Sequence, residues 1–343
     1  MRADARAIRY VPYHEIGAVP NIVVDGAPLE STVLTLSHWP VNATPSAYKR
    51  DTSTETALAW VARHDPRHIA AAVTNNHFDE DGLFSMFAVL EPRQALAHRQ
   101  LLVDASRAGD FGVYRSRHAA RICFTIEAFA DPQQSPLPRA TFVRSGSGRV
   151  AALFRALLPR LPAMLRDPGR FLRYWRAPDE HLAQSEDWLA EGRVSIEEEP
   201  DLDLAIVRIP QELPPRTVQR YLGRERVPVH PFAIHNATRC TRLVRIQGRR
   251  VEFQYRYESW LQIHSRRPAL RVDLAHFCRW LNARERNGRW TRENPLGIAP
   301  RLHLGGAATS IEPAEFLREL RRELRRRPAV WDPYDWKPPA GQA

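Results

Sequence analysis

Between residue 21 and about residue 130, short apolar segments alternate with polar loops and with longer segments of helical character. Residues 21–26 (NIVVDG) and 34–39 (LTLSHW) are typical of strands that run into polar loops, and residues 68–76 (HIAAAVTNN) are typical of a buried strand. The capping box T-S-T-E at 52–55 predicts a helix start. This alternation predicts a doubly wound, mainly parallel α/β sheet, which binds ligands at the carboxyl ends of its strands.

The second half of the chain has a different pattern. Residues 131–149 are rich in Pro, Ser and Gly, and broken amphipathic helices follow them. Residues 251–263 (VEFQYRYESWLQI) alternate aromatic and polar side chains and predict the clearest strand of the chain. We therefore expect a second, smaller α+β domain. The predicted division is a metal-binding α/β domain at 1–130, a helical connector at 131–195, an accessory substrate-binding domain at 196–327 and a tail at 328–343.

The charge of the chain is strongly positive. Its 343 residues carry a formal net charge of +11, and arginine supplies nearly all of the cations because Lys49 and Lys337 are the only lysines. Arginine pairs bidentately with phosphate, and a basic surface attracts polyanions. A GC-rich genome, which encodes surface cations mainly as arginine, explains the charge equally well. The charge alone therefore does not establish nucleic-acid binding.

Several protein classes are excluded by what the chain lacks. No apolar run approaches the roughly 18 residues that span a bilayer, and the first residues lack the apolar stretch of a signal peptide. Cys123, Cys240 and Cys278 lie far apart and form no CxxC pair, which argues against a disulfide framework or a zinc ribbon. No P-loop, GxGxxG or GxSxG motif is found. We expect a cytoplasmic protein that does not bind membranes.

The segment TNNHFDEDGLFS at residues 74–85 contains the most informative side chains. It places His77, Asp79 and Asp81 at every second position after the predicted buried strand. If the loop stays extended, these side chains point the same way, and a divalent cation would relieve the repulsion between the carboxylates. Oxygen and imidazole ligands suit Mn²⁺ or Mg²⁺. The alternative is an acidic turn that caps the next helix.

The stretch HFDEDGLFS resembles the first motif of the DHH phosphoesterase superfamily, in which a strand ends in H-x-D-x-D-G or a close variant. That superfamily includes exonucleases, nanoRNases, cyclic-dinucleotide phosphodiesterases and inorganic pyrophosphatases. Its members use a two-Mn²⁺ centre to activate water against a phosphorus ester or anhydride. The resemblance implies that His77, Asp79 and Asp81 are metal ligands and catalytic residues. It covers about a dozen residues strongly and the rest of the chain loosely.

The chain departs from the superfamily pattern because it contains no D-H-H tripeptide. Three other residues are candidates to complete the ligand set. Asp110 in AGDFG is the best candidate for the superfamily's lone strand-end Asp, with Asp104 a weaker one. Asp25 and His38 follow predicted strands upstream of the motif, which is suitable chemistry in a permuted order. The alternatives are a turn at Asp25, a loop histidine at His38 and a helix cap at Asp110.

A second, weaker similarity lies in the C-terminal half. Gly305 and Gly306, in HLGGAATS, resemble the glycine pair of the accessory domain that accompanies DHH catalytic domains. Two glycines before a helix expose backbone N–H groups that can bind an anion. Arg266, Arg267 and Arg271 could clamp a phosphate nearby. A plain glycine turn before a capped helix is the alternative.

These features predict a metal-dependent phosphoesterase, a hydrolase that uses Mn²⁺ or Mg²⁺. We expect its substrate to be a phosphate-containing small molecule, such as a nucleotide, or a short nucleic acid. The first alternative is a non-catalytic nucleotide- or nucleic-acid-binding protein of the same fold, since the D-H-H tripeptide is absent. The second is a different metal-dependent hydrolase that shares the motif by chance.

Overall fold

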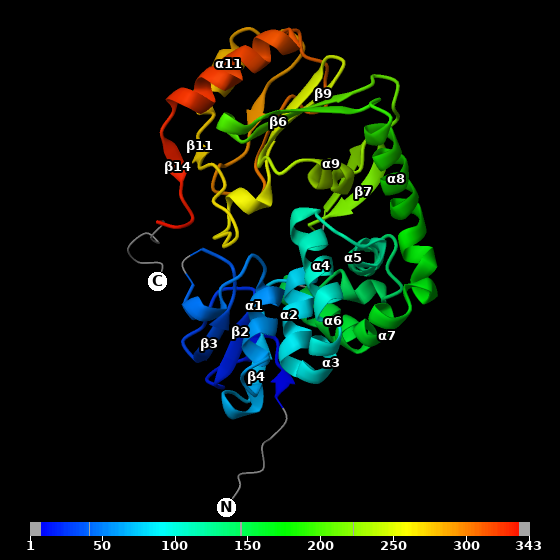
Figure 1. Ribbon diagram of the computed structural model, residues 1–343, viewed down its shortest axis with the longest axis vertical. Helices are drawn as coiled ribbons and strands as arrows, with labels where there is room; N and C mark the ends of the chain where they lie inside the picture. Colours follow the sequence, from blue (N-terminus) through cyan, green and yellow to red (C-terminus); the bar gives the residue numbers. More distant parts are fainter. Residues whose placement is uncertain (1–7, 41, 145, 222, 336–343) are drawn as a thin grey trace, which may run out of the picture. The chain divides into compact units, whose positions relative to one another are not determined.

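A computed structural model describes residues 8–335 of the chain, apart from residues 41, 145 and 222 (Figure 1). The chain forms two compact units, and each combines helices with sheet. The first unit comprises Met1–His181 and Thr217–Arg226, and the second comprises Leu182–Arg216 and Val227–Ala343. Residues 131–181, which the sequence placed in a connector, therefore belong to the first unit.

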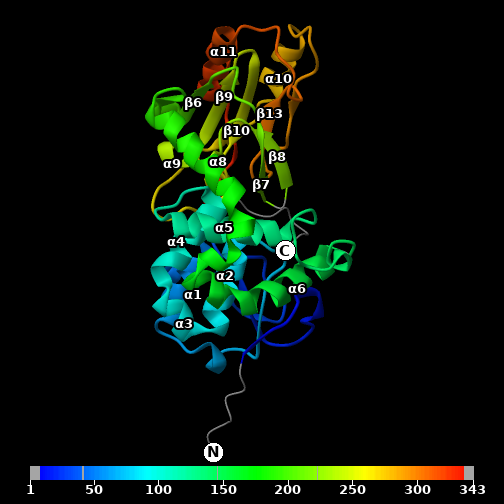
Figure 2. The ribbon, with the colours of Figure 1, turned by 90° about the vertical axis from the view of Figure 1, so that its right-hand side faces the viewer.

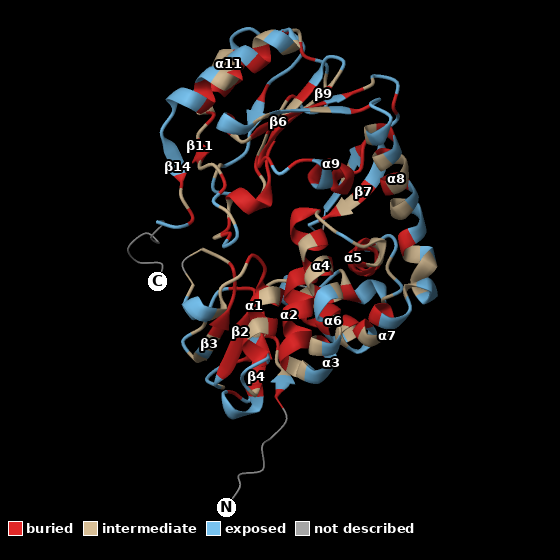
Figure 3. Ribbon diagram, viewed as in Figure 1, coloured by how far each residue is buried: buried red, intermediate tan, exposed pale blue. Residues whose placement is uncertain are grey.

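The first unit is built on a four-stranded sheet in which every neighbouring pair of strands is parallel. The strand order is β1-β4-β2-β3, so β2 lies between β4 and β3. Every residue of β2 and β4 is buried (Figure 3), as expected for apolar strands covered on both faces. The strands are β1 (Arg9–Tyr10), β2 (Asn21–Val24), β3 (Thr32–Leu36) and β4 (Ala72–Thr74).

Helices account for most of the rest of the first unit, and α2 packs against both α1 and α4. The predicted capping box is confirmed, because Thr52 and Glu55 exchange the two side-chain-to-backbone hydrogen bonds at the start of α1. A small hairpin of β7 and β8 adds to the unit (Figure 2). The elements are α1 (Ser53–Val61), α2 (Glu80–Leu90), α3 (Pro92–Ala97), α4 (Arg99–Phe111), α5 (Arg117–Ala130), α6 (Gly146–Leu157), α7 (Leu161–Arg166), β7 (Arg216–Arg220) and β8 (Gly223–Val227). Helix α8 (Leu172–Ala190) begins in the first unit, and its residues from Leu182 onward belong to the second.

The second unit contains a six-stranded sheet of order β12-β13-β10-β9-β6-β5, in which only β6 and β9 pair in parallel. Apolar side chains of this sheet and of α10 and α11 form one core. The elements are β5 (Ser195–Glu199), β6 (Leu204–Ile209), α9 (Pro231–Ala237), β9 (Arg242–Gln247), β10 (Arg250–Tyr255), β11 (Arg271–Val272), α10 (Ala275–Asn282), β12 (Thr291–Arg292), β13 (Arg301–His303), α11 (Pro313–Arg326) and β14 (Ala329–Trp331).

The strand predicted at 251–263 is shorter than expected. β10 ends at Tyr255, and a 3₁₀ turn follows at Tyr257–Ser259. The chain turns here because the buried Arg256 guanidinium donates a hydrogen bond to the carbonyl of Thr238 and pairs with Glu258 at 2.6 Å. These contacts hold the segment away from the extended path that the alternation predicted.

Two further predictions concern the chain as a whole. Among the described residues, none of the helices combines the length and the apolar character needed to cross a bilayer. In the predicted tail, β14 pairs with β11 in an antiparallel arrangement. Residues 336–343 of that tail lie outside the described part of the chain.

Candidate metal centre

Polar side chains of the first unit gather where three neighbouring strands end. Asp25 follows β2 directly, His38 lies two residues beyond β3, and His77 lies three residues beyond β4. Because β2 is the middle strand of the three, Asp25 is flanked by one histidine on each side. Asp25 has a φ of +46°, a left-handed conformation that aspartate tolerates better than most residues. The strand order thus places one carboxylate between two imidazoles.

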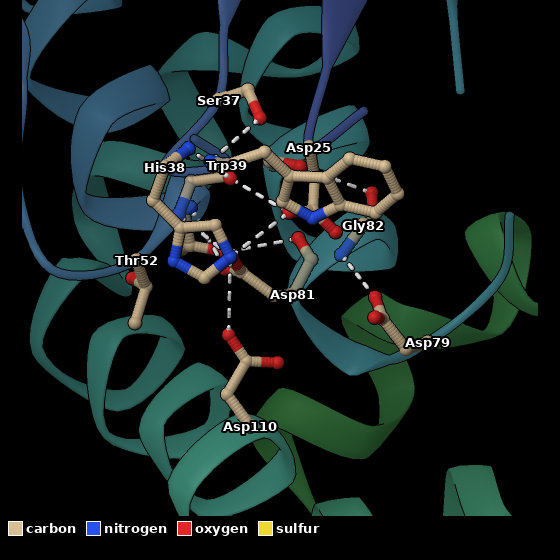
Figure 4. A network of polar contacts seen from close by, with 12 residues as sticks. Asp25, Ser37, His38, Trp39, Thr52, Asp79, Asp81, Gly82 and Asp110 are labelled. Atoms are coloured by element: carbon tan, nitrogen blue, oxygen red, sulfur yellow. Dashed lines mark hydrogen bonds and ion pairs between the residues drawn. The ribbon is translucent and has the colours of Figure 1, made fainter. Parts of the chain in front are cut away.

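The first cluster, which we call the inner group, consists of Asp25, His38 and Asp81. The Nε2 atom of His38 lies 3.3 Å from Asp25 Oδ1 and 3.7 Å from Asp81 Oδ2 (Figure 4). A third carboxylate oxygen, Asp110 Oδ2, lies 3.6 Å from the same nitrogen. All these side chains are buried. One imidazole nitrogen therefore faces three carboxylates away from solvent.

The second cluster, the outer group, consists of Asp25, His77 and Asp79. His77 Nε2 lies 2.9 Å from Asp79 Oδ2 and 3.3 Å from Asp25 Oδ2. The side chains of His77 and Asp79 are 29% and 23% exposed, so solvent reaches this group. In each group one ligand atom from every residue lies within 4.8 Å of the others, and Asp25 belongs to both. These Asp and His groups could each hold a metal ion.

The structure corrects the expectation that His77, Asp79 and Asp81 converge on one point. Helix α2 begins at Glu80, so the chain leaves its extended path before Asp81. Asp81 turns toward His38, while Asp79 faces His77. The alternative interpretation of Asp79 also holds, because its Oδ1 accepts the N–H of Gly82 at 2.8 Å and caps α2. Capping and facing the outer group use different oxygens of Asp79.

Both histidines are oriented through their Nδ1 atoms. His38 Nδ1 lies 2.7 Å from the carbonyl oxygen of Asp51, which can only accept a hydrogen bond. His77 Nδ1 lies 3.4 Å from Asn76 Oδ1. A proton on Nδ1 in each ring leaves Nε2 facing the carboxylates. Metal-binding histidines usually have such a partner on the second ring nitrogen, because it sets the tautomer and the ring direction.

The start of α1 holds the carboxylates of the inner group in place. Asp81 accepts the backbone N–H of Ser53 at 2.7 Å and that of Thr54 at 2.8 Å. The Ser53 hydroxyl donates to Asp25 Oδ1 at 2.7 Å. A helix N-terminus stabilises negative charge, so α1 favours the ionised forms of both carboxyl groups. The capping box predicted this helix start, but no local signal indicated that Asp81, 28 residues away, would bind to it.

Burial and crowding shift the pKa values of the centre. Burial is the largest influence on Asp25 and His38 and opposes the charged form of each, but the contacts of each group together outweigh it. Pairing with His38 and His77 lowers the Asp25 pKa, and pairing with Asp25 together with the Asp81 charge raises the His38 pKa to about 9. Burial, followed by the charge of Asp25, raises the Asp81 pKa to about 7. Burial and the Asp81 charge raise the pKa of Asp110 well above its usual range. The metal-free centre therefore retains protons that a divalent cation would displace.

Asp110 was predicted to lie at the end of a strand, but the structure places it in a helix. It lies in the last turn of α4 and not at the end of a strand, and it still approaches His38. Its Oδ2 atom is buried and accepts no hydrogen bond from any described residue. The weaker candidate, Asp104, instead accepts the backbone N–H groups of Arg115 and Ser116. A buried carboxylate oxygen without a donor, beside imidazole and other carboxylates, suits a hard or borderline divalent cation.

The β7–β8 hairpin supplies residues that the sequence did not indicate. Arg220 Nη2 and the Tyr221 hydroxyl both donate to the carbonyl of Asp110, at 2.9 and 2.7 Å. The Arg220 charge also opposes the rise in the pKa of two buried acids, Glu80 and Glu127, which burial raises first of all. The positively charged side chain of Arg220 therefore lies next to the acidic residues of the centre, although it is 110 residues from Asp110 in the chain. Only the fold reveals this contact.

The predicted substrate-binding arginines lie in the second unit, where each has protein partners. Arg271 is fully buried and donates to Ser259 Oγ and to three backbone carbonyls of residues 295–298. It therefore connects two loops of the protein and exposes no surface to a ligand. Arg266 donates to the carbonyl of Arg239 at 2.8 Å. Arg267 is 64% exposed and pairs with Asp332 at 3.1 Å.

The glycine pair of the second unit forms a turn, with φ values of +59° at Gly305 and +80° at Gly306. The Gly305 N–H, one of the expected anion donors, donates to His303 Nδ1 at 3.1 Å. The Glu285 carboxylate accepts the N–H and the hydroxyl of Ser310, at 2.9 and 2.8 Å. It also accepts the indole N–H of Trp290 at 3.0 Å. The segment after the glycines therefore binds an internal carboxylate.

The chain belongs to DUF6687, described as a family of unknown function, because the model of that family matches residues 6–335. Comparison with curated proteins and with solved structures found no match.

Proposed function

We propose that this DUF6687 protein is a metal-dependent phosphoesterase that uses Mn²⁺ or Mg²⁺ and acts on a nucleotide or a short oligonucleotide. The observation that carries the proposal is the position of Asp25, whose two carboxylate oxygens face different histidines in two adjoining groups. A carboxylate shared between two ligand sets suits a pair of neighbouring cations. In such a site, the cations activate water and stabilise the charge that develops on a phosphorus ester.

The inner and outer groups would have different roles in this function. The inner group is buried, and the N-terminus of α1 fixes its carboxylates, so His38 and Asp81 would hold their cation out of contact with solvent. The outer group is partly exposed through His77 and Asp79. A substrate would approach from this side. Asp25, whose oxygens face His38 and His77, would contribute to holding both cations.

The proposal extends the resemblance to DHH phosphoesterases and explains the missing tripeptide. Asp25 and His38 precede the HFDEDG motif in the chain, yet β2 and β3 lie beside β4 in the sheet. Residues upstream of the motif can thus take the places that the superfamily fills from downstream. The formal net charge of +11, carried by arginine, favours a polyanionic substrate.

Metal content and turnover together test the proposal. We expect two equivalents of Mn²⁺ per chain and Mn²⁺-dependent hydrolysis of a phosphodiester probe such as bis(p-nitrophenyl) phosphate or a short oligonucleotide. Asp25→Asn should lose both equivalents and the activity. The matched control, Asp65→Asn, changes a carboxylate that precedes β4, at the opposite end of that strand, and should retain both. Two bound equivalents without turnover would favour the non-catalytic alternative, and no metal binding would refute the proposal.

A further inference from the structure

Asn75 is a buried polar residue of the centre that has no role in either group. It follows β4 directly and is 0% exposed. Its Oδ1 atom accepts the backbone N–H of His77 at 3.0 Å. This contact sets the amide orientation, because the reverse orientation would direct an NH₂ group at a backbone N–H. The Nδ2 atom donates no hydrogen bond to any described residue, although a buried donor without an acceptor is costly.

Gly82 makes room for this amide. A Cβ at Gly82 would collide with Asn75 Nδ2, and it would lie 3.1 Å from Asp79 Oδ1 and 3.3 Å from Asp25 Oδ2. Gly82 lies within α2 and does not have a positive φ, so the helix geometry does not require glycine there. Glycine in a helix costs about 1 kcal/mol relative to alanine. The absence of a side chain at Gly82 therefore leaves the space that Nδ2 occupies, next to the outer group.

The chemistry of Nδ2 limits what it can bind. An amide NH₂ is a hydrogen-bond donor and cannot ligate a cation. Asp79 Oδ1 accepts the N–H of Gly82, Asp79 Oδ2 and Asp25 Oδ2 face His77, and neither carboxylate accepts a hydrogen bond from Nδ2. A ligand at the outer group can supply the acceptor that the described residues do not. At the exposed side of a cation site, the ligand atom that fits is an anionic oxygen.

We propose that Asn75 is a substrate-binding residue whose Nδ2 donates a hydrogen bond to a non-bridging oxygen of the phosphoryl group at the outer group. The inference rests on the proposed metal-dependent phosphoesterase function and assigns the position of the phosphoryl group within that site. Gly82 serves the same interaction, because it leaves the space that the amide occupies. Inorganic phosphate is the smallest ligand that presents such an oxygen.

Phosphate binding to the Mn²⁺-loaded protein, measured by titration calorimetry, tests the role of Asn75. Asn75→Ala should bind Mn²⁺ within about threefold of the wild-type affinity and should bind inorganic phosphate roughly 10- to 100-fold more weakly, the loss expected for one hydrogen bond to a charged group. Asn75→Asp keeps the shape but replaces the donor by an acceptor, and it should weaken phosphate binding at least as much. Gly82→Ala should reproduce the loss by displacing the amide.

Ser85→Ala is the matched control, because Ser85 is buried in α2 and donates to the carbonyl of Gly82 without touching either group. This variant should bind phosphate as the wild type does. Unchanged phosphate affinity in Asn75→Ala and Asn75→Asp would overturn the inference, as would an equal loss in Ser85→Ala. Loss of Mn²⁺ from Asn75→Ala would assign the residue to the metal group and would also overturn it. If the wild type binds no Mn²⁺, the proposed function fails and this inference fails with it.

Discussion

Replacing Glu80 by glutamine should stabilise the metal-free protein, although it removes a residue next to the centre. Glu80 is 8% exposed, and burial, followed by the charge of Asp79, raises its pKa to about 8 from the ordinary 4.5. The side chain packs against α4, where a Cβ on Gly109 would lie 2.6 Å from Glu80 Cβ. Glutamine has nearly the same shape and cannot ionise, so the substitution isolates the cost of the carboxyl group.

The sign and size of the effect follow from proton linkage. Between pH 4.5 and 8 the folded chain keeps the Glu80 proton while the unfolded chain loses it, so the wild-type free energy of unfolding falls as pH rises through this window. Each pKa unit corresponds to about 1.4 kcal/mol. The advantage of Glu80→Gln should therefore be absent near pH 4, reach roughly 3 kcal/mol at pH 7 and level off above pH 8.

Urea unfolding with a chelator present, followed by circular dichroism at several pH values, measures this difference. The control is Glu30→Gln, the same substitution at an exposed residue between β2 and β3, which should change stability little at any pH. A difference between Glu80→Gln and wild type that stays constant with pH, or grows toward acid, would refute the reasoning.

Three further outcomes are expected. Mn²⁺ binding at pH 7 should release protons, because the pKa of His38 is about 9 and that of Asp81 is about 7. Calorimetry in buffers of different ionisation enthalpy measures this release, and release of no protons would contradict the assignment of both residues as ligands. Ser53→Ala, which removes the hydroxyl donor to Asp25, should weaken Mn²⁺ binding about 10- to 100-fold in a metal titration, and an unchanged affinity would refute this supporting role. Glu285→Gln should lower the free energy of unfolding by about 1–3 kcal/mol at pH 7, as measured by thermal unfolding. That deficit should shrink as pH falls from 4.5 toward 2, because the folded pKa of Glu285 is about 2; a deficit independent of pH would refute the reasoning.

Local sequence patterns predicted the elements that carry the centre. The apolar run before Asp25 and the one before His77 form buried strands, and the capping box at Thr52 opens α1 as expected. Each of these features depends on near neighbours in the chain, so a window of about ten residues contains its physical cause. The same local view failed at Asp81, because the helix N-terminus begins at Glu80 and rotates that side chain away from His77.

The long-range contacts of the centre could not be predicted from local segments of about ten residues. Ser53 and Thr54 bind Asp81 through backbone N–H groups, which any residue type can supply. Arg220 was one arginine among many, and its contact with the carbonyl of Asp110 depends on where the β7–β8 hairpin folds. Buried Arg271 likewise could not be told from an exposed arginine by its residue type.

The amino-acid sequence alone determined which chemical groups stand at the ends of the strands, since residue type and apolar patterning are local properties. It did not determine the order of the strands. That order is a matter of tertiary packing, and it places β2 between β3 and β4, so that Asp25 is shared by His38 and His77. The residue types of the candidate ligands are therefore set by the sequence, and the sharing of one carboxylate by two groups is set by the fold.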